Sequence, residues 1–133
     1  MEYLVGVLLA LGVGVFATLA GLDRARGFYP VVLIVIASYY MLFAVMGGSR
    51  GALVVEAPIF CAFVIVAVLG FKRNLWLVVA ALVGHGILDL VHPHLIANPG
   101  APVWWPMFCL TYDLAAAGYL AALLSPARGL GRI

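Results

Sequence analysis

Five long apolar runs limit what this chain can fold into, because each is about as long as a membrane-spanning helix. The chain has 133 residues, of which 67% are hydrophobic and only 9% are charged. Such values exclude an ordinary soluble domain. A helix needs ~20 residues to cross ~30 Å of hydrocarbon, and we predict such helices at Tyr3–Leu22, Phe28–Gly47, Ala52–Gly70, Leu75–Leu95 and Met107–Ser125. The prediction is an all-α membrane protein in one domain, residues 1–133, with five transmembrane helices.

The connections between these runs and the placement of basic residues predict the topology. The connections are short, which favours an antiparallel up-down bundle of sequence neighbours. With five crossings, six of the seven Lys and Arg residues fall on one side and only Arg50 falls on the other. The six are Arg24, Arg26, Lys72, Arg73, Arg128 and Arg132. By the positive-inside rule we expect the N-terminus outside and the C-terminus in the cytoplasm.

Three of the five carboxylates lie inside apolar runs, where none of the Lys and Arg residues lies. These are Glu56, Asp89 and Asp113. A carboxylate in hydrocarbon costs several kcal/mol unless something neutralises it. The expected topology places all three roughly 6–11 Å below the outer boundary of the membrane. Protons, a partner's cation or a bound metal must therefore neutralise them, and we expect one shared pocket near the outer leaflet.

A metal site is the chemistry that this pattern favours. His85, Asp89 and His92 follow i, i+4, i+7 spacing, so they project from one stripe of a helix. Imidazoles and a carboxylate suit a divalent transition metal, with zinc expected first and iron or manganese as alternatives. Glu56 and Asp113 would complete the ligand shell or bridge a second ion. The predicted metal ligands are thus His85, Asp89, His92, Glu56 and Asp113.

Structural roles remain open for each of these residues. His92 and His94 flank Pro93 at a helix end, where a histidine can sit among lipid headgroups. His85 can be a hydrogen-bonded core histidine, and the carboxylic acids can be protonated and bonded to neighbouring groups. Cys109 precedes Asp113 by four residues and shares its helical face, so it is either a soft metal ligand or a packed thiol.

Tyrosines near the expected site are candidate helpers. Tyr112 adjoins Asp113, and Tyr39 and Tyr40 lie in the outer half of the second predicted helix. A tyrosine hydroxyl can donate a hydrogen bond to an oxyanion, although packing is an alternative role for each ring. For catalysis we expect Glu56, Asp113 and Tyr112, one of the carboxylates serving as general base.

Two further segments suggest how the site is enclosed. Residues 96–106 hold three prolines and two tryptophans, which suits either an interfacial anchor or a lid that admits an amphiphile. Ala10, Gly14 and Thr18 repeat every four residues, and such a small-residue stripe lets another helix approach closely. Packing inside the bundle and a homodimer seam are both compatible with the stripe.

The second half of the chain resembles a family of small bacterial integral membrane proteins of unknown function. The shared pattern is His85-x3-Asp89-x2-His92, then Asn98-Pro99, then Cys109-x3-Asp113, with an upstream glutamate that would match Glu56. This resemblance implies that the residues form one site in a bacterial inner (plasma) membrane. The chain is more loosely similar to alkaline ceramidase-like and adiponectin-receptor-like membrane hydrolases, which surround zinc with Ser, Asp and His residues. That likeness implies zinc-dependent hydrolysis of a lipid.

Three functions follow from these patterns. The first is a metal-dependent membrane enzyme, most naturally a hydrolase, that acts on a lipid-like substrate near the outer leaflet. The second is a proton or metal-ion transport component. The third is a small accessory subunit whose carboxylates pair with a partner's basic residues. Expected partners are membrane lipids and a lipid-like small molecule, with no nucleic acid; a homo-oligomer or a larger membrane complex stays open.

Overall fold

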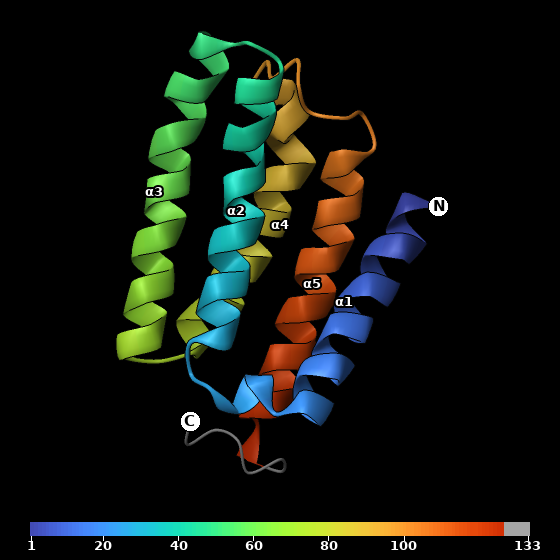
Figure 1. The fold of residues 1–133 in the computed structure, drawn as a ribbon, viewed down its shortest axis with the longest axis vertical. Coiled ribbons are helices and arrows are strands. Elements are labelled where there is room, and N and C mark those ends of the chain that lie inside the picture. The colour runs from blue at the N-terminus through green and yellow to red at the C-terminus, as the bar shows by residue number, and fades with distance from the viewer. Residues whose placement is uncertain (127–133) are drawn as a thin grey trace.

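A computed structural model of the chain describes residues 1–126, which form five long helices and one short 3₁₀ helix (Figure 1). The elements are α1 (Glu2–Ala20), η1 (Leu22–Arg24), α2 (Phe28–Met46), α3 (Arg50–Lys72), α4 (Trp76–Leu95) and α5 (Trp105–Leu124). All five long helices are long and apolar enough to cross a membrane. Their ends lie within two residues of the predicted ones. The predicted all-α fold is confirmed, its five long helices have the length and hydropathy of membrane spans, and hydropathy alone located them.

Local sequence sets where two of these helices begin and end. Gly21 follows α1 with a φ of 80°, a left-handed conformation that glycine adopts without steric cost, and its N–H bonds back to α1. Ser49 precedes α3, and its side chain accepts a hydrogen bond of 3.1 Å from the Ala52 N–H. These caps produce the tight connections that an up-down bundle needs.

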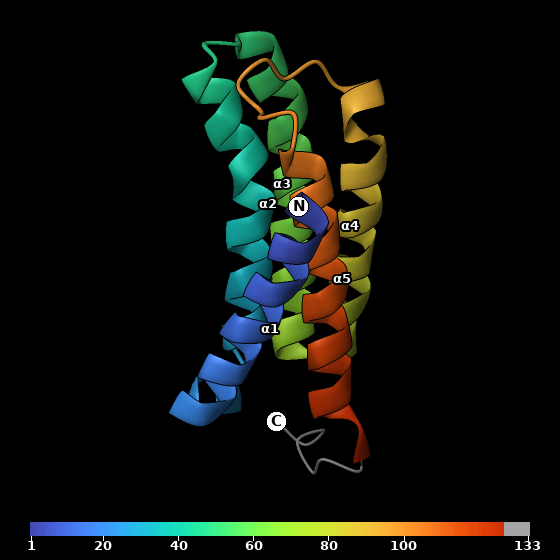
Figure 2. The ribbon, with the colours of Figure 1, turned by 90° about the vertical axis from the view of Figure 1, so that its right-hand side faces the viewer.

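The helices pack in an order that differs from the chain order at one point. α2 packs along α3, α3 against α4, and α4 along α5, with α2 also touching α4. Helix α1, however, packs along α5 rather than along α2 (Figures 1 and 2). The expectation that sequence neighbours pack together is therefore wrong for α1 and α2, which are separated over most of their length.

Small residues explain why α1 lies against α5. Gly6, Ala10 and Gly14 are buried on one face of α1. A Cβ atom at Gly6 would overlap the side chain of Thr111, and one at Gly14 would lie 3.0 Å from the ring of Tyr119. Only small residues allow this close approach. Of the predicted stripe, Ala10 and Gly14 are used inside the bundle, whereas Thr18 is exposed.

The bundle has two ends, which we name after a residue at each. The Asn98 end carries the turn at 47–49 and the loop at 96–104, and the Asp23 end carries η1 and the turn at 73–75 (Figure 1). Four of the basic residues lie at the Asp23 end, namely Arg24, Arg26, Lys72 and Arg73, whereas Arg50 lies at the Asn98 end. Arg128 and Arg132 lie outside the described residues. The orientation of the bundle in the membrane stays a prediction.

The buried polar residues are concentrated in one half of this bundle. Within residues 1–126, five of the six buried charged or imidazole side chains are in the Asn98 half, and only Asp23 is at the other end. The five are Glu56, His85, Asp89, His92 and Asp113. The remainder of the core is apolar, and large apolar side chains also cover much of the exterior. The fold thus isolates one polar region inside a hydrocarbon-facing shell.

Candidate functional site

Helix α4 contributes three polar side chains from a single buried face. His85, Asp89 and His92 are no more than 2% exposed, as their i, i+4, i+7 spacing predicts. Gly86 brings α4 close to α5 at this level. A Cβ atom there would lie 3.3 Å from Leu110 Cδ1 and 3.5 Å from Asp113 Cβ. The short distance between the two helices places Asp113 beside His85.

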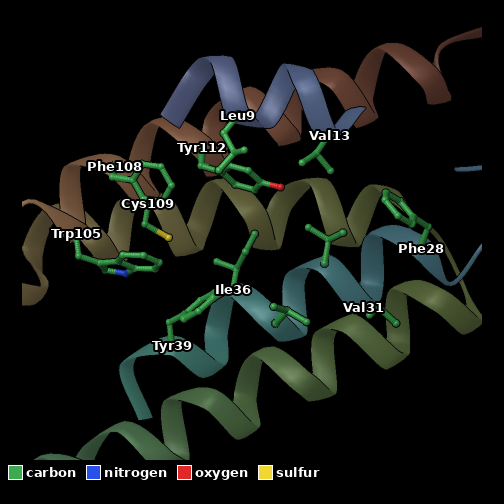
Figure 3. Close-up of a pocket in the computed structure, with 12 residues that line it drawn as sticks. Leu9, Val13, Phe28, Val31, Ile36, Tyr39, Trp105, Phe108, Cys109 and Tyr112 are labelled. Carbon is green, nitrogen blue, oxygen red and sulfur yellow. The ribbon is translucent and has the colours of Figure 1, made fainter. Parts of the chain in front are cut away.

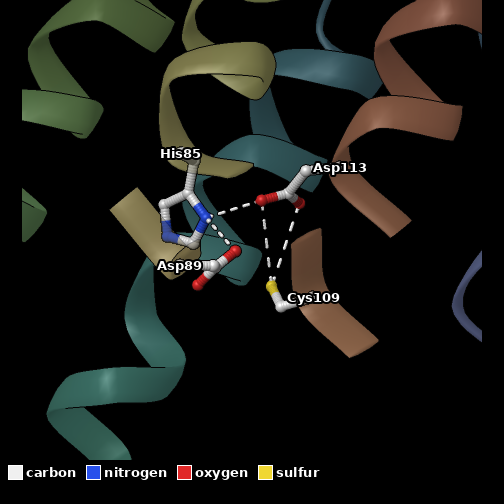
Figure 4. Close-up of side chains that lie close together, drawn as sticks. All are labelled: His85, Asp89, Cys109 and Asp113. Atoms are coloured by element: carbon white, nitrogen blue, oxygen red, sulfur yellow. Dashed lines mark hydrogen bonds and ion pairs between the residues drawn. The ribbon is translucent and has the colours of Figure 1, made fainter. Parts of the chain in front are cut away.

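Four potential metal ligands from α4 and α5 meet at this point (Figure 4). They are His85, Asp89, Cys109 and Asp113, and one donor atom from each lies within 4.8 Å of all the others. His85 Nδ1 is 2.7 Å from Asp113 Oδ2 and 3.4 Å from Asp89 Oδ2. Cys109 Sγ is 3.8 Å from the nearer Asp113 oxygen. We call these residues the four-donor cluster.

In the four-donor cluster, the His85 imidazole is the one group that can carry a positive charge beside two carboxylates. Two carboxylates are fully buried there, and no Lys or Arg is buried anywhere in the described part of the chain. Asp89 Oδ2 accepts no hydrogen bond from any described residue. A carboxylate oxygen in this position requires a proton or a cation.

The donor set fits a divalent metal by its chemistry. Zinc takes imidazole nitrogen, carboxylate oxygen and thiolate sulfur at about 2.0–2.3 Å, commonly with four ligands. Donor atoms around a tetrahedral ion lie roughly 3–4 Å apart at these bond lengths. The spacing in the four-donor cluster is close to this, so small side-chain rotations would complete a shell.

A second polar pair stands apart from the four-donor cluster. His92 Nε2 is 2.5 Å from Glu56 Oε1, and both residues are 2% exposed. Asn98 Nδ2 donates to the same Glu56 oxygen at 3.3 Å. His92 lies seven residues beyond His85, which corresponds to about 10.5 Å along the helix axis. The structure therefore divides the predicted five ligands between two levels, with His85, Asp89 and Asp113 at one and His92 with Glu56 at the other.

Tyr40 connects the two levels. Its hydroxyl donates a 2.7 Å hydrogen bond to Asp89 Oδ1, and its ring stacks on His92 with centroids 3.7 Å apart. Its backbone carbonyl accepts a hydrogen bond of 2.9 Å from Asn98. Of the tyrosines that the sequence suggested as helpers, Tyr40 is the one that contacts the site.

Tyr112 lies elsewhere. Its ring lines an apolar groove between α1, α2 and α5, near Leu9 (Figure 3). Adjacent residues on a helix point about 100° apart, because 3.6 residues make one turn, so Tyr112 and Asp113 face different surroundings. The expected catalytic tyrosine is thus placed beside the groove rather than among the four donors.

Sequence reasoning missed one aromatic neighbour of the site. Phe63 on α3 packs edge-on against the His85 ring, with centroids 4.9 Å apart. Nothing in the sequence distinguishes this phenylalanine from the others in apolar runs. His94, by contrast, is exposed at the end of α4, as its interfacial interpretation predicts.

The loop at the Asn98 end covers the Glu56–His92 pair. A cavity of about 620 Å³ lies there and is lined by His92, Asn98 and several prolines. Trp104 is 52% exposed, whereas Trp105 is buried against Tyr39 and Phe43. The two tryptophans therefore differ in environment, one facing outward and the other closing the bundle.

Comparison of the chain with protein-family models, curated proteins and solved structures gave no match. The resemblances described from the sequence therefore stay predictions. Functional interpretation depends on the geometry of the site itself.

Proposed function

We propose that this integral membrane protein binds a divalent metal ion at His85, Asp89, Cys109 and Asp113 and hydrolyses an ester or amide of a lipid-like substrate. Zinc is the expected ion, with iron or manganese as alternatives. One observation carries the proposal: four buried donor atoms lie within 4.8 Å of one another, two of them from carboxylates, without a buried Lys or Arg in residues 1–126. When bound, a divalent ion would supply the missing positive charge, and expansion of its shell from four to five ligands would let it polarise a carbonyl group.

The proposal extends to orientation and location. We place the Asn98 end outside and the Asp23 end in the cytoplasm, because the described basic residues other than Arg50 lie at the Asp23 end. The site would then lie beneath the outer leaflet, where it meets membrane lipids. A bacterial inner membrane is the location that the family resemblance favours.

The surrounding residues have roles that follow from their contacts. Tyr40 donates to Asp89 and so fixes the orientation of that carboxylate. The rings of Phe63 and Tyr40 lie beside the His85 imidazole, with centroids 4.9 and 6.3 Å away, and restrict its orientation. Glu56 and His92 form a hydrogen-bonded acid–imidazole pair beside the cavity at the Asn98 end. Because the pair lies at a different level from the cluster, it would receive the proton of the attacking water through an intervening water rather than as its direct base.

Elemental analysis of detergent-purified protein tests metal binding. We expect stoichiometric metal in the wild type and loss of metal in Asp89→Asn and Asp113→Asn, because each removes a ligand charge. Glu2→Gln is the matched control, since it neutralises a carboxylate in the first turn of α1 that contributes no donor to the cluster. Circular dichroism would establish that the variants fold. A wild type that stays metal-free after supplementation would refute the site.

Turnover of a fluorogenic long-chain acyl ester and its matching amide tests the reaction. We expect hydrolysis by the metal-loaded protein, loss with a chelator and recovery when metal is restored. Glu56→Gln should lower turnover while retaining metal, because Glu56 lies with His92 and not among the four donors. Metal-loaded protein that cleaves neither compound would contradict the hydrolase assignment.

Transport is the second candidate, and one observation favours it. Hydrogen bonds connect Asn98 and Glu56 to Asp89 through Tyr40, so polar groups continue from the cavity toward the middle of the bundle. Along the bundle axis, however, the described residues place no other buried carboxylate or histidine between the level of the four-donor cluster and Asp23 at the opposite end. Proton or metal-ion uptake by vesicles containing the purified protein would favour transport over hydrolysis.

A further inference from the structure

An apolar groove opens where α1 and α2 separate. Its volume is about 400 Å³, and α1, α2 and α5 form its walls (Figure 3). This volume lies within the ~300–1,000 Å³ of typical small-molecule pockets. No charged side chain lines the groove. A ligand that fills it must be mostly apolar.

The groove faces the membrane rather than water. Leu9, Val31 and Val35 line it and are 47%, 57% and 46% exposed, and they lie in helices that are apolar enough to span a bilayer. The adjoining medium is therefore hydrocarbon. A lipid chain gains little from leaving one apolar medium for another, so selective binding here requires shape fit and a polar contact.

One end of the groove supplies such a polar contact. Trp105 lines the groove and is only 9% exposed, yet its indole Nε1–H has no hydrogen-bond partner among the residues that the structure describes. A buried N–H of this kind is satisfied by an acceptor such as a carbonyl oxygen. The opposite end, at Phe28, is apolar. The groove is thus apolar along most of its length, with the Trp105 N–H at one end and the Tyr112 hydroxyl between the two ends (Figure 3). This polarity suits an alkyl chain whose carbonyl group lies at the Trp105 end.

The same end adjoins the four-donor cluster. Cys109 belongs to both, because its side chain lines the groove while its sulfur lies 3.8 Å from an Asp113 oxygen. Figure 3 draws this side chain among the groove residues, and Figure 4 draws it with the other three donors. A carbonyl group held near Trp105 would therefore lie on the side of the groove where the cluster lies.

We propose that the groove binds the hydrocarbon chain of a fatty-acyl amphiphile, with its carbonyl group at Trp105 beside Cys109. The inference rests on the proposed function, and it names the substrate class for that site as long-chain acyl esters or amides. Helix α1 has the role of forming one wall of this chain-binding groove.

Photocrosslinking tests the chain site. The probe is a palmitic acid analogue with a diazirine in mid-chain, added to the full-length protein in phosphatidylcholine vesicles and mapped by mass spectrometry. We expect labels on groove-lining residues of α1, α2 and α5. Val35→Phe fills the groove and should reduce this labelling roughly tenfold. Val54→Phe is the matched control, since Val54 is 71% exposed on α3 outside the groove, and it should leave labelling unchanged.

Trp105→Phe tests the carbonyl contact, because it removes the N–H and keeps an aromatic ring. It should weaken labelling by the fatty acid severalfold and leave labelling by a diazirine-bearing alkane unchanged. Labels spread over all exposed apolar faces in proportion to exposure would overturn the proposal. If a helix of a second copy occupied the groove, the probe could not enter and the groove residues would stay unlabelled. That result would also overturn the proposal.

Metal content measured in the same samples separates this inference from the function on which it rests. A labelled groove in protein that binds no metal supports the chain site and refutes the metal-dependent reaction. Metal-loaded protein with an unlabelled groove refutes the chain site alone.

Discussion

At the scale of single residues, each carboxylate in the membrane interior has a partner on a different helix. An unpaired Asp at the centre of a membrane helix costs about 2.5–3.5 kcal/mol on insertion scales, so such a partner matters for folding. The pairs are Asp113 on α5 with His85 on α4, Glu56 on α3 with His92 on α4, and Asp89 on α4 with Tyr40 on α2. The polar groups thus connect four helices as well as form a site.

Tyr40→Phe should weaken metal binding while preserving the fold. The substitution removes the hydroxyl that donates to Asp89 and retains the ring that stacks on His92. Partners of metal ligands typically account for roughly 10–100-fold in metal affinity, and we expect a loss in that range. Competition titration with a chelator measures it. Tyr29→Phe is the control, because that buried hydroxyl has no partner within residues 1–126, and equal affinities in both variants would contradict the prediction.

The sequence predicted which residues share a helical face, but not how they divide along the helix axis. His85 and His92 do share the buried face of α4, as their spacing indicates. The axial rise between them, about 10.5 Å, could have shown that one ion cannot bind both. The participation of Tyr40 rather than Tyr39 or Tyr112 depends on how α2 and α5 are rotated against α4. Sequence periodicity does not determine that rotation.

At the scale of elements, glycines fix the loop at the Asn98 end over the site. A Cβ atom at Gly100 would overlap the backbone carbonyl of Phe43, and it would lie 2.9 Å from the Gly47 nitrogen. The loop therefore lies directly on the end of α2. Asn98 adds hydrogen bonds from the loop to Tyr40 and Glu56. The loop that covers the Glu56–His92 pair is therefore held in place by backbone contact with α2, in addition to the stiffness that its prolines give.

Gly100→Ala should destabilise the protein by about 1–3 kcal/mol, the usual cost of forcing extra atoms into a packed region. Equilibrium unfolding in detergent measures this as a lower free energy of unfolding. Gly118→Ala is the control, since a Cβ atom at Gly118 would meet nothing within 4 Å. That change should be neutral or stabilise by up to ~1 kcal/mol through helix propensity. Equal destabilisation by the two variants would show that the loop does not require glycine.

The elements themselves were predictable from hydropathy, whereas their packing order was not. Each apolar run had to become a helix, because a membrane-spanning backbone must satisfy its own hydrogen bonds. The small residues of α1 indicated that another helix approaches closely, but they did not say which one. The answer depends on Thr111 and Tyr119 of α5, whose fit against Gly6 and Gly14 is a property of two distant segments. The groove beside α1 exists because α1 packs on α5 and not on α2, and it was not predicted.

At the scale of the whole molecule, the bundle is polar inside at one end and apolar at its membrane-facing surface. The Asn98 half holds the four-donor cluster, the Glu56–His92 pair and the cavity above them. The Asp23 end holds most of the described basic residues. Arg26 is bonded to the backbone carbonyls of Phe71 and Gly70 there, so it also ties the connection between α1 and α2 to the end of α3. The polar site and most of the described basic residues thus lie at opposite ends of the bundle, so the orientation of the bundle decides which leaflet the site faces.

Cysteine accessibility in intact cells should place the Asn98 end outside. Val103→Cys lies in the loop at that end, where Val103 is 97% exposed, and Asn74→Cys lies in the turn at the Asp23 end. In a Cys61→Ser background, a membrane-impermeant maleimide should label the first variant in intact cells and the second only after lysis, because basic residues retain their end in the cytoplasm. The background protein alone controls for Cys109, which is buried. Labelling in the reverse order would move the site to the cytoplasmic leaflet, and any acyl substrate would then have to reach the groove from that leaflet.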